Sequence, residues 1–120
     1  MEIDLHGYHP EDILETGVFA KLVQQAWEMG ETEMDFIHGH GHKRGKSVGF
    51  VNTNTGFFGL KIRSELRHSD ELRQWIKRTT LDCSDPGRTG VKLKRNKGPT
   101  RKKLDELLKP LTERPFKVSF

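Results

Sequence analysis

The sequence predicts a small α/β domain, because two strand-like segments enclose an amphipathic helix and are followed by a second helix and further strands. The chain has 120 residues, the usual size of one domain. Apolar residues make up 32% of it and charged residues another 32%, with a mean hydropathy of −0.74. We therefore expect a small core under a strongly solvated surface.

The first element is a short strand. Residues 2–6 alternate in polarity and end at Gly7, with Ile3 and Leu5 on the buried face. A helix is expected over residues 10–29, since Pro10 suits a first helical position and Gly30 suits a helix end. The apolar positions of that helix are Leu14, Val18, Leu22 and Ala26, widened by Phe19 and Val23.

A second strand is expected from Thr32 to His38. Met34 and Phe36 alternate there with Asp35 and Ile37. A strand, a helix and a strand joined by short connections form a βαβ unit, so the two strands should be parallel neighbours.

The remaining residues should complete the fold with a second helix and two C-terminal strands. Ser69 and Asp70 can cap that second helix again in its middle. The expected elements are a polar, inserted flap or hairpin over 43–59, a helix over 60–78, strands over 79–83 and 90–94 joined by a tight turn at 84–87, and a short helix over 104–109 ended by Pro110.

Composition excludes several classes of protein. No run approaches the roughly 18 apolar residues that a membrane span needs, and no hydrophobic segment follows Met1, so we expect neither secretion nor a membrane partner. The single cysteine, Cys83, cannot form an internal disulfide or build a zinc site by itself. Such cysteine usage fits a cytoplasmic protein.

Charge is sorted along the chain. Residues 1–42 carry nine acidic side chains and one basic one, a net of −8, so the other 78 residues carry +12 of the total charge of +4. Six of the ten residues at 94–103 are basic. Such sorting indicates either a face turned toward a polyanion or a lysine-rich surface that keeps the protein soluble. The basic run is accordingly either a phosphate-binding arm or a solvated tail.

Asp4 and His6 form the first candidate site. Residues two apart on a strand share a face, so both should point away from Ile3 and Leu5, at the carboxyl end of the strand. Ligands of open α/β sheets bind at that edge. An Asp beside a His fixes the imidazole tautomer and suits it to acid/base work, although an exposed histidine next to a capping Asp is the simpler interpretation.

The end of the second strand is the second candidate site. Gly39 and Gly41 let the backbone approach a phosphate with exposed N–H groups, and His38 can donate a proton to it. Lys43, Arg44 and Lys46 add positive charge. Because parallel strands end at the same edge, both candidate sites should form one pocket.

These two segments resemble the signatures of the Smr (small MutS-related) domain. Residues 3–7, IDLHG, are similar to its LDxHG motif, and residues 38–41, HGHG, are similar to its HGxG loop. Residues 60–77 and 85–93 look like its second helix and its approach to the last strand, so the resemblance covers about 3–94. The flap at 43–59 is longer than the usual link, and the tail after residue 95 lies outside the pattern.

The resemblance implies a compact two-layer α/β sandwich like the C-terminal domain of translation initiation factor three. It implies a domain over 1–95 followed by a basic extension over 96–120. It also implies binding of DNA or RNA, with endonuclease activity in several members. The alternative is a non-catalytic module that binds branched DNA or structured RNA.

We accordingly expect catalysis by Asp4, His6 and His38, in which Asp4 orients His6 and the two histidines act as an acid/base pair. No cofactor is firmly expected, but a divalent metal is favoured if DNA is the substrate, because water must then attack. The expected nucleic-acid contacts are Gly39, His40, Gly41, Lys43, Arg44, Lys46, Arg88, Lys92, Lys94 and Arg95.

Several features remain open at this level. His38, His40 and His42 have a spacing that can present three imidazoles to a metal, but the two intervening glycines oppose a continued strand, so we assign no metal site. Phe50, Phe57 and Phe58 either stack on unpaired bases or close a cap over the second helix. The chain is compatible with a free-standing protein and with a piece of a larger one, and it indicates no oligomeric state.

Overall fold

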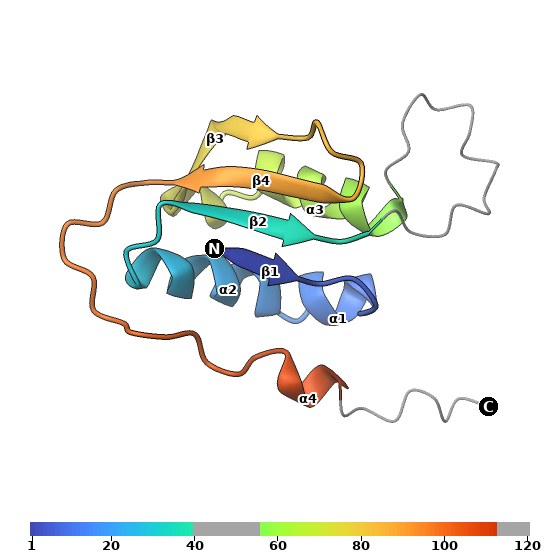
Figure 1. The fold of residues 1–120 in the computed structure, drawn as a ribbon, viewed down its shortest axis with the longest axis horizontal. Coiled ribbons are helices and arrows are strands. Elements are labelled where there is room, and N and C mark those ends of the chain that lie inside the picture. Colours follow the sequence, from blue (N-terminus) through green and yellow to red (C-terminus); the bar gives the residue numbers. More distant parts are fainter. Residues whose placement is uncertain (40–55, 113–120) are drawn as a thin grey trace.

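A mixed sheet with helices on one face is the frame of the molecule (Figure 1). The computed structural model describes residues 1–39 and 56–112. Within these ranges the sheet has four strands in the order β1-β2-β4-β3, with β1 parallel to β2 and β4 antiparallel to both β2 and β3. The strands are β1 (Glu2–Asp4), β2 (Glu33–Ile37), β3 (Ile76–Asp82) and β4 (Arg88–Leu93). This arrangement confirms the predicted α/β sandwich and its parallel βαβ unit.

The helices of the second layer pack on one side of the sheet. They are α1 (Pro10–Leu14), α2 (Val18–Glu28) and α3 (Phe57–His68), followed by the 3₁₀ helix η2 (Leu72–Gln74), with α4 (Lys109–Thr112) near the described C-terminal end. Figure 1 shows α1, α2 and α3 behind the strands, and no helix within residues 1–39 and 56–112 covers the opposite face, which is called the open face below.

Alternation along the strands decides which side chains enter the core. Ile3 and Leu5 are buried as predicted, as are Met34 and Phe36 of β2. The rings of Phe19 on α2 and Phe36 lie 4.9 Å apart between centroids, which joins the helix layer to the sheet. Charged side chains occupy the open face, where those of Glu2, Asp4, Glu33 and Lys92 are exposed.

The helix predicted over 10–29 is in fact two helices. Gly17 lies between α1 and α2 with φ +88°, a left-handed conformation that no regular helix accepts. The Thr16 hydroxyl donates to the Asp12 carbonyl (2.6 Å) at the end of α1. Because Leu14 and Val18 still pack against the core on either side of the break, the four-residue apolar spacing did not reveal it.

The helix predicted over 60–78 is also wrong at both ends. α3 begins at Phe57, so Phe57 and Phe58 are helical rather than the second arm of a hairpin. It ends at His68, and the Ser69 hydroxyl then accepts a hydrogen bond from Leu72 N–H (3.2 Å), as expected for a residue that caps a new turn. β3 begins at Ile76, three residues before its predicted start. The rest of the predicted flap, residues 43–55, lies outside the described ranges.

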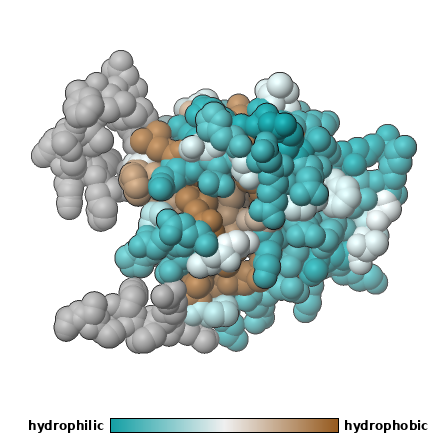
Figure 2. All heavy atoms as spheres, turned by 180° about the vertical axis from the view of Figure 1, so that it is seen from behind, coloured by the Kyte–Doolittle hydropathy of each residue, from teal (hydrophilic) through white to brown (hydrophobic). Residues whose placement is uncertain are grey.

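The aromatic residues at the start of α3 have different environments. Phe58 is buried in the core, whereas Phe57 is 66% exposed with the Lys61 ammonium 5.2 Å from its ring centroid. Phe57 and Leu60 are the large apolar side chains that remain exposed among the described residues. Figure 2 looks onto the helix side and shows hydrophobic residues gathered in one part of an otherwise hydrophilic face.

Residues 96–105 form a strap that closes the C-terminal end of α2. The last carbonyls of a helix have no partner within it. Here the Glu28 carbonyl accepts hydrogen bonds from the backbone N–H groups of Thr100 (3.0 Å) and Arg101 (3.2 Å). The Trp27 carbonyl accepts one from the Asn96 amide (2.8 Å). The predicted helix over 104–109 is absent, and the short α4 instead contains Pro110.

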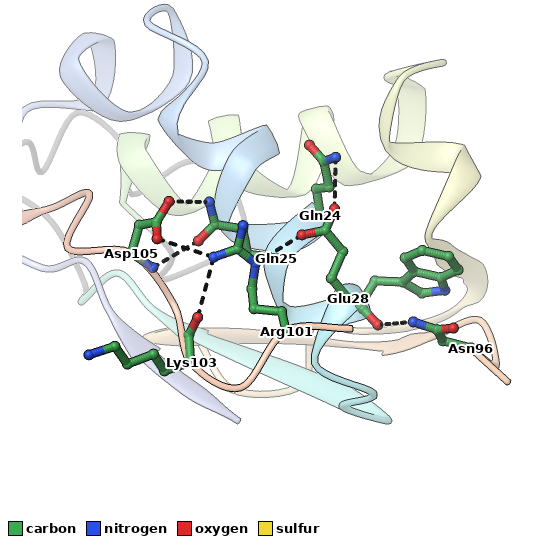
Figure 3. A network of polar contacts seen from close by, with 8 residues as sticks. Gln24, Gln25, Glu28, Asn96, Arg101, Lys103 and Asp105 are labelled. Atoms are coloured by element: carbon green, nitrogen blue, oxygen red, sulfur yellow. Dashed lines mark hydrogen bonds and ion pairs between the residues drawn. The ribbon is translucent and has the colours of Figure 1, made fainter. Parts of the chain in front are cut away.

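Charged side chains strengthen the docking of the strap (Figure 3). Arg101 Nε donates to Glu28 Oε1 (2.9 Å), and Arg101 Nη1 donates to Asp105 Oδ1 (3.1 Å). The bond to Glu28 is the main reason that the pKa of Arg101 lies above its ordinary value. Gln25 donates to the Asp105 carboxylate (3.0 Å) and accepts from its backbone N–H (2.9 Å). One cation of the basic run is therefore neutralised within the molecule.

Two glycines provide a test of strap docking. Gly17 and Gly30 both have positive φ (+88° and +84°), but an added Cβ meets nothing within 4 Å at Gly17 and meets Pro99 Cγ at 2.8 Å at Gly30. We expect Gly17→Ala to lower the free energy of unfolding by about 1–2 kcal/mol, because alanine is strained at a positive φ even where it meets no neighbour. Gly30→Ala should cost at least about 1 kcal/mol more, because the stiff Pro99 ring must move.

Denaturant unfolding followed by tryptophan fluorescence measures both costs. Adding Pro99→Gly to Gly30→Ala should bring its cost back toward that of Gly17→Ala. Equal costs for the two single variants would show that the strap does not lie against Gly30.

Candidate functional site

The carboxyl ends of β1 and β2 lie side by side, as the two motifs predicted. Leu5 N–H donates to the Ile37 carbonyl (2.8 Å) just beyond the paired residues. Gly39 follows with φ +77°, and a Cβ built on it lies 3.4 Å from the Cβ of His6. The chain segments that carry the two candidate sites are therefore in contact.

Asp4 and His6 form a hydrogen-bonded dyad on the open side of the sheet. Asp4 Oδ1 lies 3.0 Å from His6 Nδ1 and accepts a bond from the His6 backbone N–H at 3.1 Å. The side chains are 62% and 66% exposed. A carboxylate only accepts, so the neutral imidazole carries its proton on Nδ1 and keeps the Nε2 lone pair for a proton from a ligand.

The same contacts act on Asp4. The hydrogen bond from the His6 side chain, followed by the one from its backbone, holds the pKa of Asp4 below its ordinary value of 3.8. Asp4 is thus a carboxylate at neutral pH and keeps the orientation of the ring.

The structure places His38 away from this dyad. Its side chain is 3% exposed and lies on the helix side of the sheet, with Met34 and Phe36. The expected acid/base pair of His6 and His38 is not formed. β1 and β2 end at Asp4 and Ile37, before the predicted strand ends, but the alternation continues past them and puts His6 outside and His38 inside. That alternation was readable in the sequence, since residues 34, 36 and 38 share one parity.

The glycine loop is also engaged within the protein. The backbone N–H groups of His38 and Gly39 both donate to the Gly87 carbonyl, at 3.1 and 3.0 Å. The Gly39 N–H is therefore not exposed to hold a phosphate, contrary to the expectation. His40, Gly41, Lys43, Arg44 and Lys46 lie outside the described residues.

The predicted basic contacts divide into two groups. Arg88 and Asp4 lie on opposite sides of β2, since both neighbour Ile37 in register, and the Arg88 guanidinium forms an ion pair with Glu2. Its Nε is buried and has no hydrogen-bond partner among the residues that the structure describes. Lys92 is four residues further along β4, about 13 Å away by strand rise. Lys94 and Arg95 follow it, and all three are exposed.

Acidic neighbours on the open face were not predicted as part of the site. Glu2 and Asp35 face each other in register between Asp4 and the basic end of β4. The Asp35 carboxylate lies over Gly90, where an added Cβ would be 2.7 Å from Oδ1. The polarity alternation of both strands was the signal for these positions.

Two buried polar residues next to His38 were missed as well. Thr89 is fully buried on β4, and Arg63 is 6% exposed on the core side of α3. The signals in the sequence were a threonine at an inward strand position and an arginine between Ile62 and Leu66.

No group of three or more His, Cys, Asp or Glu side chains within 1–39 and 56–112 is arranged to hold a metal ion. In the same ranges, no helix has the length and apolar character to span a membrane. Comparison with protein-family models, curated proteins and solved structures finds no match.

The Asp4–His6 bond predicts a specific acid titration. A carboxyl whose folded pKa is depressed stabilises the fold above its ordinary pKa, and this contribution is lost as pH falls through the folded value. We expect the Asp4 carboxyl to titrate below pH 3.8 in carbon-detected NMR. His6→Ala should move that midpoint up toward 3.8, because the main cause of the shift is removed. An unchanged midpoint would show that the dyad is not formed in solution.

Proposed function

We propose that this chain is a nucleic-acid-binding domain that cleaves phosphodiester bonds, with RNA as its substrate class. The observation that carries the proposal is the exposed dyad, in which Asp4 holds His6 at the carboxyl edge of the sheet beside Gly39. Ligands of open α/β sheets bind at this edge. The resemblance of residues 3–7 and 38–41 to the Smr motifs supports the same site.

RNA is favoured because it carries its own nucleophile. His6 Nε2 takes the proton of the 2′-hydroxyl, whose oxygen then attacks the adjacent phosphorus. The bond from phosphorus to the 5′-oxygen breaks, which leaves a 2′,3′-cyclic phosphate. The departing oxygen takes a proton from water, and the resulting hydroxide removes the proton from His6. On DNA, water must be the nucleophile, and a divalent ion is then expected to activate it.

The burial of His38 changes its proposed part in the reaction. A side chain that is 3% exposed on the other face of the sheet does not reach a leaving oxygen near His6. We therefore propose a single histidine as the base, with Asp4 as its orienting partner, and assign His38 to the support of the loop at Gly39.

Charge on the open face suggests the path of the bound strand. Glu2 and Asp35 repel phosphates over β1 and β2, whereas Lys92 pairs in register with Lys77 of β3. Two lysines opposite each other on neighbouring strands repel, and a phosphate between them removes that cost. We propose that the backbone runs along β4, from Arg88 near the dyad to Lys94 and Arg95.

A second candidate function is a module that binds nucleic acid without cutting it. The bonded Gly39 N–H and the acidic pair Glu2 and Asp35 near Asp4 favour it, because both weaken the hold on a phosphate at the dyad. The two candidates share the β4 contacts and differ in what His6 does.

Cleavage by the proposed mechanism has a defined response to substitution. We expect the wild type to cut single-stranded RNA in excess chelator and to leave 2′,3′-cyclic phosphate ends. His6→Ala should lower kcat at least about 100-fold, which is the usual contribution of a general base. Asp4→Asn should lower it less, because the ring remains but loses its charged partner.

His68→Ala is the matched control, since this exposed histidine ends α3 and belongs to no part of the site. It should cut as the wild type does. Equal product from wild type and His6→Ala would indicate a contaminating nuclease, and RNA binding without cleavage would leave the binding module.

Binding along β4 can be tested separately by its salt dependence. The double variant Lys94→Gln/Arg95→Gln should bind RNA more weakly, and its slope of log K against log salt should fall by about 0.7 per lost phosphate contact. The control, Lys21→Gln/Arg73→Gln, removes the same charge from exposed positions on α2 and η2. If both variants lose affinity equally in fluorescence anisotropy, total charge and not the β4 path governs binding.

A further inference from the structure

Three polar side chains are buried together where α3 packs on the sheet. Arg63 of α3 is 6% exposed, Thr89 of β4 0% and His38, at the end of β2, 3%. Arg63 Nε donates to Thr89 Oγ1 at 2.7 Å, and Thr89 Oγ1 lies 2.9 Å from His38 Nε2. The other ring nitrogen, His38 Nδ1, lies 3.0 Å from the Gly39 carbonyl oxygen. These bonds connect a buried guanidinium to the loop that contacts His6.

The chemistry of the atoms fixes the direction of this chain. A carbonyl oxygen only accepts, so His38 Nδ1 is protonated. In the neutral ring Nε2 then has no proton, so it accepts a hydrogen bond from the Thr89 hydroxyl. That hydroxyl itself accepts a hydrogen bond from Arg63. Every donor therefore points from Arg63 toward Gly39, and the hydroxyl of Thr89 acts once as acceptor and once as donor.

Arg63 reaches the same loop by a second route. Its Nη2 donates to the carbonyls of Asp85 (2.8 Å) and Arg88 (3.1 Å), which flank the turn before β4. The Gly87 carbonyl of that turn accepts the N–H groups of His38 and Gly39. One guanidinium thus holds two parts of this segment. It holds the His38 ring through Thr89, and it holds the backbone N–H groups of His38 and Gly39 through the turn that contains Gly87.

We propose that Arg63 and Thr89 are positioning residues for His6, acting through His38 and Gly39. Gly39 lies next to His6, since a Cβ built on Gly39 would be 3.4 Å from the Cβ of His6. A shift of the loop therefore moves the ring that Asp4 orients. The effect of this positioning on cleavage rests on the proposed function, whereas the positioning itself does not.

The position of Thr89 requires a hydroxyl rather than a particular shape. Serine keeps both hydrogen bonds, whereas valine keeps the volume and loses them. Buried groups left without their partner are costly, so valine forces Arg63 and His38 to rearrange. Thr89→Val and Thr89→Ser are therefore a matched pair that differs in the proposed interaction.

Nitrogen-15 NMR of the histidine rings tests the positioning without any substrate. In the wild type at pH 7.5, neutral His38 should show a protonated Nδ1 and a bare Nε2. Thr89→Val should change the ring signals of both His38 and His6, and Thr89→Ser should leave them near the wild-type values. A wild-type His38 that carries its proton on Nε2 would overturn the proposal, and this measurement needs no variant to fold.

Steady-state cleavage of RNA gives the functional readout. Thr89→Val should lower kcat by about 10- to 100-fold, the loss expected when a catalytic group is displaced by up to about 1 Å, with KM nearly unchanged. Thr89→Ser should retain most of the wild-type activity. A Thr89→Val protein that folds, with His6 signals and kcat unchanged, would refute the positioning role. If the wild type does not cleave RNA, the proposed function fails, and the His6 signals alone decide the inference.

Discussion

The covering of one sheet face by helices is the constraint on which the rest of the structure depends. Successive side chains of a strand point alternately to the packed face and to the open face of the sheet. Asp4 and His6 fall on the open face and remain available to a ligand. His38, which directly follows β2 of the same sheet, falls on the packed face and becomes part of the interior.

Burial of polar groups on that packed face has consequences for the site. A guanidinium inside a protein must be compensated by hydrogen bonds, and Arg63 makes them with Thr89 and with the turn before β4. The same bonds determine where Gly39 lies. The hydrogen bonds that compensate the buried Arg63 guanidinium thus also position the Gly39 loop beside the dyad.

Charge sorting along the chain has an internal component. Arg101 forms ion pairs with Glu28 and Asp105, and Arg88 forms one with Glu2. Two of these three acidic partners belong to the acidic N-terminal part of the chain. Lys92, Lys94 and Arg95, which remain exposed on β4 and directly after it, are among the residues proposed to meet phosphates. The net charge of the later segments therefore overstates the positive charge that they leave unpaired.

The sequence alone determined the βαβ unit, the buried positions of Ile3, Leu5, Met34 and Phe36, and the shared face of Asp4 and His6. These features follow from periods of two and four residues, which are local. Tertiary structure decided where helices break and which partners buried polar groups find. Gln25 and Asp105 meet across 80 positions, and His38 meets Thr89 across 51. No local period encodes such contacts, because they arise only when the layers pack together.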